Sequence, residues 1–395
     1  MPWKTESAAR QRWEFVREHL AGKSSLKRLC GQWRISRKTA YKWIARFQER
    51  GRFGLTDRPR LAHRVHNRPA AHWQRRIRRW RARHPTWGAR KLRWALQRRF
   101  GGRDVPSEAA IGRWLRAWRL TRRRRRPVAR RGPVVARPRL SPARRANEVW
   151  TVDFKGWFRT GDGTRVEPLT VRDLASRYVL AVRLLRRQTV RECQVAMARV
   201  FGRYGLPRVI RADNGSPFGA GGALGLTRLS AWWVKLGIRV EFIEPGHPEQ
   251  NGAHEQLHRV YLAEAAQPSA QTSRGQQLRS ERWRTHYNHE RPHEGLGMRL
   301  PATLYRPSRR RLQPLHPWRY PRAWESRLVR SHGQITFRGR SRFVGEAFER
   351  ERVGLEPRAP GVWRVYFGPL FAGELWAQDA GGLRAVHYRH RRPKT

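Results

Sequence analysis

The sequence is poor in cysteine, in acidic residues and in long apolar runs. Only Cys30 and Cys193 occur among 395 residues, which argues against a disulfide framework and against a cysteine-based zinc site. No stretch approaches the length of a membrane span, and the first residues, MPWKTESAAR, lack the apolar core of a signal peptide. These absences predict a cytoplasmic protein.

Acidic side chains are scarce relative to basic ones, and this imbalance points to a polyanionic partner. There are 29 Asp and Glu against 87 Lys and Arg, which gives a formal net charge of +58. Such an excess would drive a compact chain apart unless a polyanion neutralised it. A GC-rich genome can explain the preference for Arg over Lys, but it does not explain the net charge. DNA is the expected partner, because basic side chains displace its condensed counterions on binding.

Composition and hydrophobic pattern divide the chain into several segments. Hydrophobic residues make up 38% and aromatic residues 11% of the sequence, so most of it should fold. The predicted segments are a helical domain over 1–58, a second helical domain over 59–121, a basic Pro/Arg linker over 122–146, an α/β domain over 147–306, a linker over 307–325, a small β-barrel over 326–385 and a basic tail over 386–395.

The first helical domain contains a pattern typical of a helix-turn-helix. Ser24 or Ser25 can cap one helix, Gly31 suits the bend, and Ser36 can cap the next helix. Polar residues near the start of the second helix are left facing outward, where a recognition helix meets base edges and phosphates. These candidate DNA-binding residues are Ser36, Arg37, Lys38, Thr39, Tyr41 and Lys42. The alternative is a plain helical hairpin with a solvated basic face.

The second helical domain shows a similar helix-turn-helix pattern less clearly. Pro85, Trp87 and Gly88 precede one helix, and Ser107 can cap another. Its candidate DNA contacts are Arg113, Arg116 and Arg119. A structural helical bundle is the alternative, whereas two tandem readers would let the protein recognise a long DNA end.

Three acidic positions stand out in the basic α/β domain. Asp153 lies in a predicted strand, VWTVDF, and Asp213 follows another strand in RVIRADNG, where Asn-Gly supplies the turn. The third acid lies in PGHPEQNGAHEQLH, where a Gly/Pro loop leads into a helix. Strand ends and a helix face are rigid platforms for carboxylates that must share metal ions.

The motifs around these acids resemble those of the retroviral-integrase-like DDE transposases of bacterial insertion sequences. The motifs are WTVDF (150–154), ADNG (212–215) and PEQNGAHE (248–255). The segments VRDLASR (171–177), YNHERPHE (287–294) and PATLY (301–305) also resemble the family. The resemblance implies a ribonuclease-H-like core with five strands and flanking helices, preceded by the helix-turn-helix region. It also implies metal-binding, catalytic acids at Asp153, Asp213 and one glutamate.

Two glutamates compete for the third position. Many family members have 35 residues between the second Asp and the Glu, and that count leads to Glu249 here. Alignment of the N-G-x-x-E pattern leads to Glu255, because the stretch 219–226 looks like an extra loop that lengthens the interval to 41 residues. Glu249 also lies in the Pro/Gly loop before the helix, where it would be poorly fixed. Glu255 is therefore the predicted third acid.

The chemistry explains why carboxylates are required. Hard oxygen ligands favour Mg²⁺ or Mn²⁺, and two such ions about 3.5–4 Å apart can activate the attacking oxygen and stabilise the leaving one. The resemblance implies that water cleaves the transposon end and that the released 3′-hydroxyl then attacks a target strand. It also implies double-stranded DNA, as transposon ends and target, and a homo-oligomer assembled on DNA at the bacterial nucleoid.

Two other functions remain open at this point. His254 to His258, HEQLH, matches the H-E-x-x-H pattern of zinc metalloproteases, with Glu281 as a conceivable third ligand. The basic helix-turn-helix and the two aspartates have no use in a protease. The other alternative is a DNA-binding protein without activity, such as a relic of a mobile element.

The predicted C-terminal β-barrel resembles the small barrel that follows the catalytic core in integrase-like enzymes. Arg338, Arg340 and Arg342 recur there at every second position, as a phosphate-contacting surface would. A structural or self-associating barrel is the alternative, and the last residues, RHRRPKT, are expected to form a flexible basic tail.

Overall fold

The computed structural model describes most of the chain in two compact units. It describes residues 7–57, 71–102, 104–121, 140–244, 248–379 and 381–386. Contacts divide the chain into a unit over Met1–Arg68 and a unit over Pro69–Thr395. Most of the linker predicted over 122–146 and the tail predicted over 386–395 lie outside the described residues. None of the described helices combines the length and the apolar character needed to cross a membrane.

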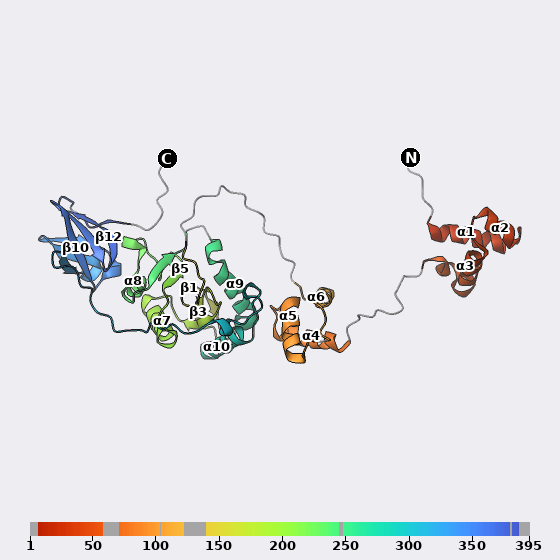
Figure 1. The fold of residues 1–395 in the computed structure, drawn as a ribbon, viewed down its shortest axis with the longest axis horizontal. Coiled ribbons are helices and arrows are strands. Elements are labelled where there is room, and N and C mark those ends of the chain that lie inside the picture. The colour runs from red at the N-terminus through yellow and green to blue at the C-terminus, as the bar shows by residue number, and fades with distance from the viewer. Residues whose placement is uncertain are drawn as a thin grey trace. The chain divides into compact units, whose positions relative to one another are not determined.

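The first unit is a three-helix domain with a small apolar core (Figure 1). Its helices are α1 (Ala8–Leu20), α2 (Leu26–Gln32) and α3 (Arg37–Arg50). The Ser36 hydroxyl accepts the Thr39 N–H at 3.2 Å, as expected of an N-cap. Gly31, which the sequence placed at the bend, instead lies inside α2. The chain turns at Arg34, whose φ is +51°, and the Ile35 N–H closes this turn by donating to the Cys30 carbonyl at 3.0 Å.

A second three-helix domain opens the larger unit. Its helices are α4 (Ala71–Arg83), α5 (Ala89–Phe100) and α6 (Glu108–Ala117). The Ser107 side chain accepts the Ala110 N–H at 3.2 Å and so caps α6, as predicted. Trp73, Ile77 and Leu92 are at most 3% exposed and form the centre of a core that also contains Trp87.

The α/β domain is built on a mixed sheet with helices on both faces (Figure 1). The strands are β1 (Val149–Phe154), β2 (Phe158–Arg159), β3 (Arg165–Asp173), β4 (Val179–Leu185), β5 (Val209–Ala212) and β6 (Arg239–Phe242). The order is β2-β3-β1-β5-β6, with β4 paired to β3. Central β1 is antiparallel to β3 and parallel to β5. This is the ribonuclease-H-like core that the sequence predicted, with the short β2 added.

Two layers of helices bury the two faces of this sheet. The helices are α7 (Val190–Tyr204), α8 (Arg228–Lys235), α9 (Gly252–Tyr261), the π-helical turn η4 (Leu262–Ala266) and α10 (Ser273–His289). Trp150 and Val152 of β1 pack in the core that contains α7 and α8, with Phe154 beside it. Val179 and Val182 of β4 pack on the other face, against α9, η4 and α10. Asp153 lies on that second face because side chains alternate along a strand.

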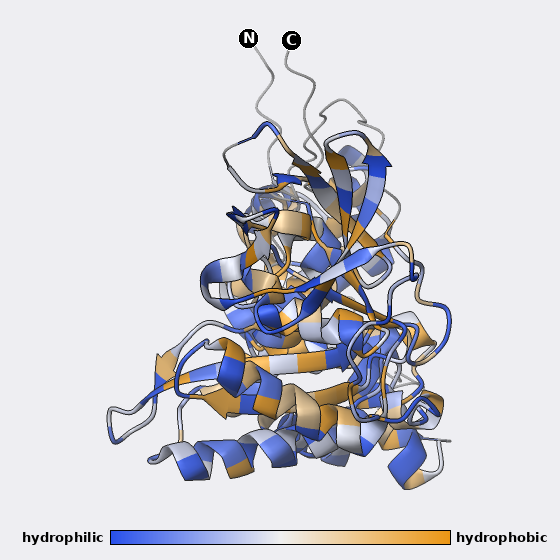
Figure 2. Cartoon of the chain, turned by 90° about the vertical axis from the view of Figure 1, so that its left-hand side faces the viewer, coloured by the Kyte–Doolittle hydropathy of each residue, from blue (hydrophilic) through white to orange (hydrophobic). Residues whose placement is uncertain are grey.

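Where the structure describes it, the C-terminal region forms an open sheet, and the small β-barrel predicted from the sequence is not closed. Its strands are β7 (Glu325–Leu328), β10 (Arg352–Ala359), β11 (Val362–Phe367), β12 (Leu370–Trp376) and β13 (Arg384–Ala385), with a separate hairpin of β8 (Gln334–Phe337) and β9 (Arg340–Phe343). The order β13-β12-β11-β10-β7 leaves β13 and β7 unjoined among the described residues. Polar and apolar residues alternate along the strands (Figure 2), as expected when a sheet buries one face.

The glycine-rich stretch 219–226 packs beneath this open sheet. Ala223, Leu224 and Leu226 share a buried cluster with Phe348 and Val365 of the C-terminal region. The Leu224 N–H donates to the Val386 carbonyl at 3.1 Å. The stretch that looked like extra loop in the sequence therefore forms part of the contact between the α/β domain and the C-terminal sheet.

The arginine pattern predicted for the C-terminal region is not a continuous surface. Arg340 is exposed, and Arg338 lies in the turn before β9 with a φ of +52°. Arg342 is only 4% exposed, and its guanidinium donates to the carbonyls of Asp379, Gly381 and Ala377. Arg342 therefore stabilises the loop that contains Asp379, and its guanidinium is not part of an exposed row of phosphate-contacting arginines.

Candidate active site

Strand pairing places the two aspartates side by side. In the parallel pairing of β1 with β5, Thr151 lies opposite Arg211. Continuing this register by two residues puts Asp153 opposite Asp213, which directly follows the last residue of β5. Residues in register on neighbouring strands point to the same face. Both carboxylates therefore lie on one face of the sheet, at the carboxyl ends of β1 and β5, on the side that α9 covers.

Asp153 is half-buried beside other acids and has a perturbed pKa. Burial raises its pKa to about 6, and the negative charges of Asp213 and Glu255 act in the same direction. The Asn251 side-chain amide opposes this shift, because it donates to Asp153 Oδ2 at 2.7 Å. The three acids thus lie close enough for their charges to interact.

Asp213 presents an oxygen that the described residues leave unsatisfied. Its Oδ1 is buried and has no hydrogen-bond partner among them. Burial raises the pKa of this carboxyl, and the Gly215 N–H lowers it. A buried acceptor without a partner is costly, so this oxygen is suited to bind a cation or a donor from a substrate.

Glu255 lies on the first turn of α9 and is exposed. Leu257 and Tyr261 anchor this helix in the core beneath the sheet. The Arg172 guanidinium, from β3, also holds the helix start by donating to the Ala253 carbonyl at 2.5 Å. Glu249 lies in the short turn Pro248–Asn251 before the helix, and its side chain is outside the described part of the structure.

The carboxylates do not form a preassembled metal cage. Within the described residues, no group of three or more His, Cys, Asp or Glu side chains is placed to hold a metal ion. Asp153 and Asp213 are adjacent by strand register. The negative charge of Glu255 raises the pKa of Asp153 less than the negative charge of Asp213 does.

The histidines of the HEQLH sequence are packing residues in this structure. His254 is fully buried, and burial holds its pKa well below the usual value. His258 lies 2.8 Å from the Thr170 hydroxyl, and burial lowers its pKa to about 3. Glu281, the conceivable third zinc ligand, instead pairs with Arg284 at 2.8 Å on α10. The described residues therefore offer no zinc site of the H-E-x-x-H type.

The candidate DNA-reading residues mostly face outward. Arg37, Lys38, Tyr41 and Lys42 are exposed on α3, while Ser36 and Thr39 are engaged with each other at the helix start. Arg113 and Arg116 are exposed on α6. Arg119, also exposed, lies beyond the end of that helix in a turn with φ +56°.

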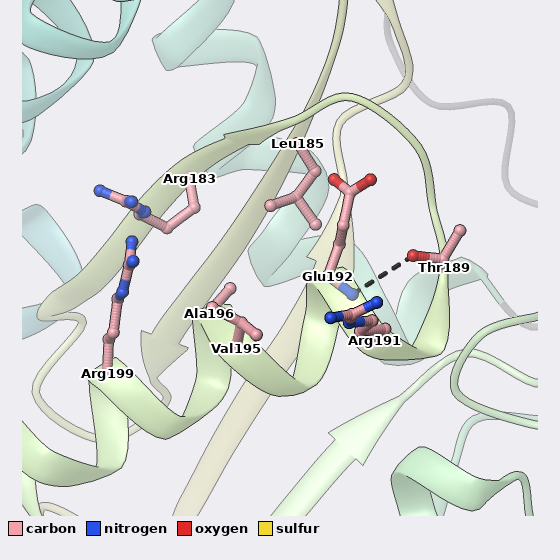
Figure 3. Close-up of a pocket in the computed structure, with 8 residues that line it drawn as sticks. All are labelled: Arg183, Leu185, Thr189, Arg191, Glu192, Val195, Ala196 and Arg199. Carbon is pink, nitrogen blue, oxygen red and sulfur yellow. Dashed lines mark hydrogen bonds between the residues drawn. The ribbon is translucent and has the colours of Figure 1, made fainter.

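A surface hollow lies away from the three acids, between the end of β4 and the first turns of α7 (Figure 3). It measures about 420 Å³. Figure 3 shows Arg183 and Arg199 extending toward each other on one side, with Arg191 and Glu192 on the other. No candidate catalytic residue lines this hollow.

Sequence reasoning did not identify Asn251 as a partner of Asp153. The two residues are 98 positions apart, so only the fold brings them together. Asn251 does fall inside the PEQNGAHE motif, directly before the helix that carries Glu255, and that position was the available signal.

Comparisons with protein families cover most of the chain. The Integrase core domain family matches residues 143–248, and a second Integrase core domain family matches 236–301. A Helix-turn-helix domain matches 11–63, a Homeodomain-like domain matches 39–115, and the C-terminal domain of the IS481 family of transposases matches 325–373.

Two insertion-element proteins are similar in sequence. The uncharacterized 31.7 kDa protein of insertion element IS407 from Burkholderia multivorans is 29% identical over 219 residues, which are 52% of this chain and 75% of that protein. The uncharacterized 39.2 kDa protein of insertion element IS476 from Xanthomonas euvesicatoria is 31% identical over 194 residues. That match spans 45% of this chain and half of the relative's length.

Solved structures of viral integrases are also similar. The catalytic core domain of HTLV-2 integrase, in complex with magnesium, is 16% identical with a TM-score of 0.31, and the match covers 41% of this chain and 98% of that one. The intasome of simian T-cell lymphotropic virus, in complex with the PP2A regulatory subunit B56 gamma, is 14% identical with a TM-score of 0.36. It covers 76% of this chain and 95% of that one.

Proposed function

The chain belongs to the DDE transposases of bacterial insertion sequences, with integrase core and helix-turn-helix domains. We propose that Asp153, Asp213 and Glu255 are its catalytic carboxylates. The observation that carries this assignment is the register of β1 and β5, which sets the two aspartates side by side. The effect of Glu255 on the pKa of Asp153 supports the third position.

The proposed ligands suit a hard divalent cation. Carboxylate oxygens are the ligands that Mg²⁺ and Mn²⁺ prefer, and the unsatisfied Oδ1 of Asp213 is an available donor. Asp153, Asp213 and Glu255 would hold the metal, most simply as two ions. When bound, such ions activate the attacking oxygen and stabilise the leaving one. DNA carries phosphate oxygens that can complete the site, so an assembled cage is not required before DNA binds.

The other residues of the site orient these carboxylates. Asn251 donates to Oδ2 of Asp153, which restricts the rotation of that side chain. Arg172, fully buried, holds the start of α9 through the Ala253 carbonyl, and so places Glu255. These contacts restrict carboxylates that would otherwise rotate freely.

The reaction is cleavage and joining of DNA. Water attacks the phosphodiester at the transposon end, the bond from phosphorus to the 3′-oxygen breaks, and a 3′-hydroxyl is released. That hydroxyl then attacks a phosphodiester of the target strand, whose own 3′-oxygen leaves. Each step exchanges one phosphorus–oxygen bond for another, so no covalent protein intermediate is needed.

The helical domains supply the DNA contacts in this proposal. Arg37, Lys38, Tyr41 and Lys42 on α3 would read one part of the transposon end. Arg113 and Arg116 on α6 would contact another, and Arg119 would reach phosphate from the turn beyond. Joining two ends requires more than one active site, so a homo-oligomer would assemble on the DNA, in the cytoplasm at the nucleoid.

The test uses the full-length chain with duplex DNA that carries the element's own end. We expect nicks at one position in Mg²⁺, and no detectable nicks from Asp153→Asn, Asp213→Asn or Glu255→Gln, because each substitution removes a charged metal ligand. Glu249→Gln is the matched control and should retain cleavage. Loss of cleavage in Glu249→Gln alone would move the third role to that residue. A wild-type chain that binds the end but never nicks it, in Mg²⁺ or Mn²⁺, would favour a DNA-binding relic.

A further inference from the structure

A turn of the second helical domain is docked against the helices that lie beneath the active site. The turn spans His84 to Gly88, between α4 and α5, and its sequence is HPTWG. It is stiff, because the Trp87 N–H donates to the His84 carbonyl at 3.0 Å and Trp87 is 1% exposed in its own domain's core.

The centre of this contact is a buried polar triangle. The Thr86 hydroxyl donates to Glu264 of η4, and Arg291 donates to both of them, to the Thr86 hydroxyl at 2.9 Å and to Glu264 at 2.8 Å. The Arg291 and Glu264 side chains are only 4% and 7% exposed. Trp283 Nε1 donates to the second oxygen of Glu264 at 2.9 Å. Thr86 thus contributes the one group of this buried network that comes from the helical domain.

Stacked rings extend the contact on one side of the triangle. The His84 ring lies 4.8 Å from the His286 ring of α10, with 18° between their planes. His84 also stacks on Trp87 at 4.2 Å. On the other side, Lys91 of α5 lies 3.9 Å from Glu294. The aromatic stack, the hydrogen bonds of Thr86 to the buried Arg291–Glu264 pair and the Lys91–Glu294 ion pair together make a specific interface between the two domains.

The partner of the turn is the continuation of the helix that carries Glu255. Glu264 lies on the π-helical turn that directly follows α9. It is nine residues after Glu255, which corresponds to about 13 Å at a rise of 1.5 Å per residue. Irregular π-turns are frequent at functional positions in helices. The YNHERPHE motif supplies both Arg291 and Glu294 to this contact between the two domains.

We propose that the His84–Gly88 turn docks the second helical domain on the α9–η4 helix, so that the contact of Thr86 with Glu264 and Arg291 determines how far from the recognised end the strand is cut. Thr86, Glu264 and Arg291 are positioning residues in this account. The inference rests on the proposed function, because it assumes that this domain holds the transposon end.

The deciding variant is Thr86→Val, which removes the hydroxyl but keeps the shape and leaves the Arg291–Glu264 ion pair intact. We expect the full-length variant to bind the end duplex with unchanged affinity and to cut it at several neighbouring phosphodiesters. The rate at the wild-type position should fall about tenfold or more, because small misplacements of reacting groups are costly. Thr86→Ser keeps the hydroxyl and should restore the single position. Thr285→Val is the control, since its hydroxyl bonds only its own helix at 3.0 Å.

Hydrogen exchange without DNA gives a readout that does not need catalysis. Amides of η4 and of the His84–Gly88 turn should be protected in the wild type and lose protection together in Thr86→Val, while α7 keeps its protection. Cutting at one unchanged position by Thr86→Val, or equal protection in both proteins, would overturn the docking proposal. Absence of nicking by the wild type would instead overturn the proposed function, and the exchange result would still decide the docking.

Discussion

At the scale of single residues, the site depends on how each carboxylate is held. Asp153 is half-buried and accepts a hydrogen bond from Asn251, whereas Asp213 keeps one oxygen without a partner among the described residues. The two acids thus differ in their freedom to rotate, although their strands place them side by side.

Asn251→Ala is expected to slow cleavage without weakening DNA binding. A hydrogen bond to a charged group is worth about 1.5–3 kcal/mol, or roughly a ten- to hundredfold effect if it is needed in the transition state. Nicking rates across a range of Mg²⁺ concentrations measure the effect, and we expect a higher Mg²⁺ requirement as well. Gln256→Ala, at an exposed position of the same helix, is the matched control. Unchanged rates at every Mg²⁺ concentration would show that Asn251 does not position Asp153.

At the scale of elements, the helix that carries Glu255 connects the proposed active site to the second helical domain. Arg172 holds its first turn, and the π-helical turn η4 at its other end receives the His84–Gly88 turn. Burial is the main cause that lowers the pKa of His84 to about 4, and His286 and Arg291 lower it further, while Glu264 and Glu290 oppose the shift. The state in which the His84–Gly88 turn is docked therefore favours the neutral form of the His84 ring.

The docking of this turn should weaken in acid. A histidine whose pKa is lower in the docked state stabilises that state fully above its ordinary value near 6.5, and this stabilisation is lost as the pH falls from 6.5 toward 4. Protection factors of the η4 amides, corrected for intrinsic exchange, should fall over this range relative to those of α7. His84→Phe keeps a stacking ring without a titrating group, so its protection should not depend on pH in this way. A wild-type profile parallel to that of His84→Phe would contradict the assignment.

At the scale of the whole molecule, the α/β domain and the C-terminal sheet of the larger unit share a buried apolar cluster in addition to being linked along the chain. The C-terminal sheet buries the glycine-rich stretch of the α/β domain in one cluster. Lys235 of α8 also pairs with Glu351 at 2.6 Å. One face of the open sheet is thereby buried in part against the neighbouring domain, as expected for packed layers of secondary structure.

Leu226→Ala should destabilise both domains together. Leu226 is 4% exposed in the shared cluster, and truncation of a buried leucine costs about 2–5 kcal/mol. Chemical denaturation followed by circular dichroism and by tryptophan fluorescence measures the free energy of unfolding, and both signals should shift by the same amount. Leu278→Ala is the control, because Leu278 is 55% exposed on α10. A shift in only one of the two signals would mean that the domains unfold independently.

Much of the fold and of the candidate site was predictable because the relevant signals are local. Alternation along VWTVDF puts Asp153 on the face opposite Trp150 and Val152, and these two residues are indeed buried in the core on the α7 side. Ser36 and Ser107 cap the helices that they were expected to cap. Local patterns failed at Gly31, which lies within a helix although glycine suits a bend. They failed again at Arg342, whose burial depends on carbonyls about 40 residues away.

The sequence alone determined which residue types stand at the ends of which strands and helices, since periodicity and capping act over a few residues. The tertiary structure decided which of these ends meet. The register of β1 with β5 brings Asp153 to Asp213, and the contact of Thr86 with Glu264 joins positions 178 residues apart. The C-terminal sheet also shares a buried cluster with the stretch 219–226 of the α/β domain. Such pairings depend on complementary surfaces far apart in the chain, and no local pattern records them.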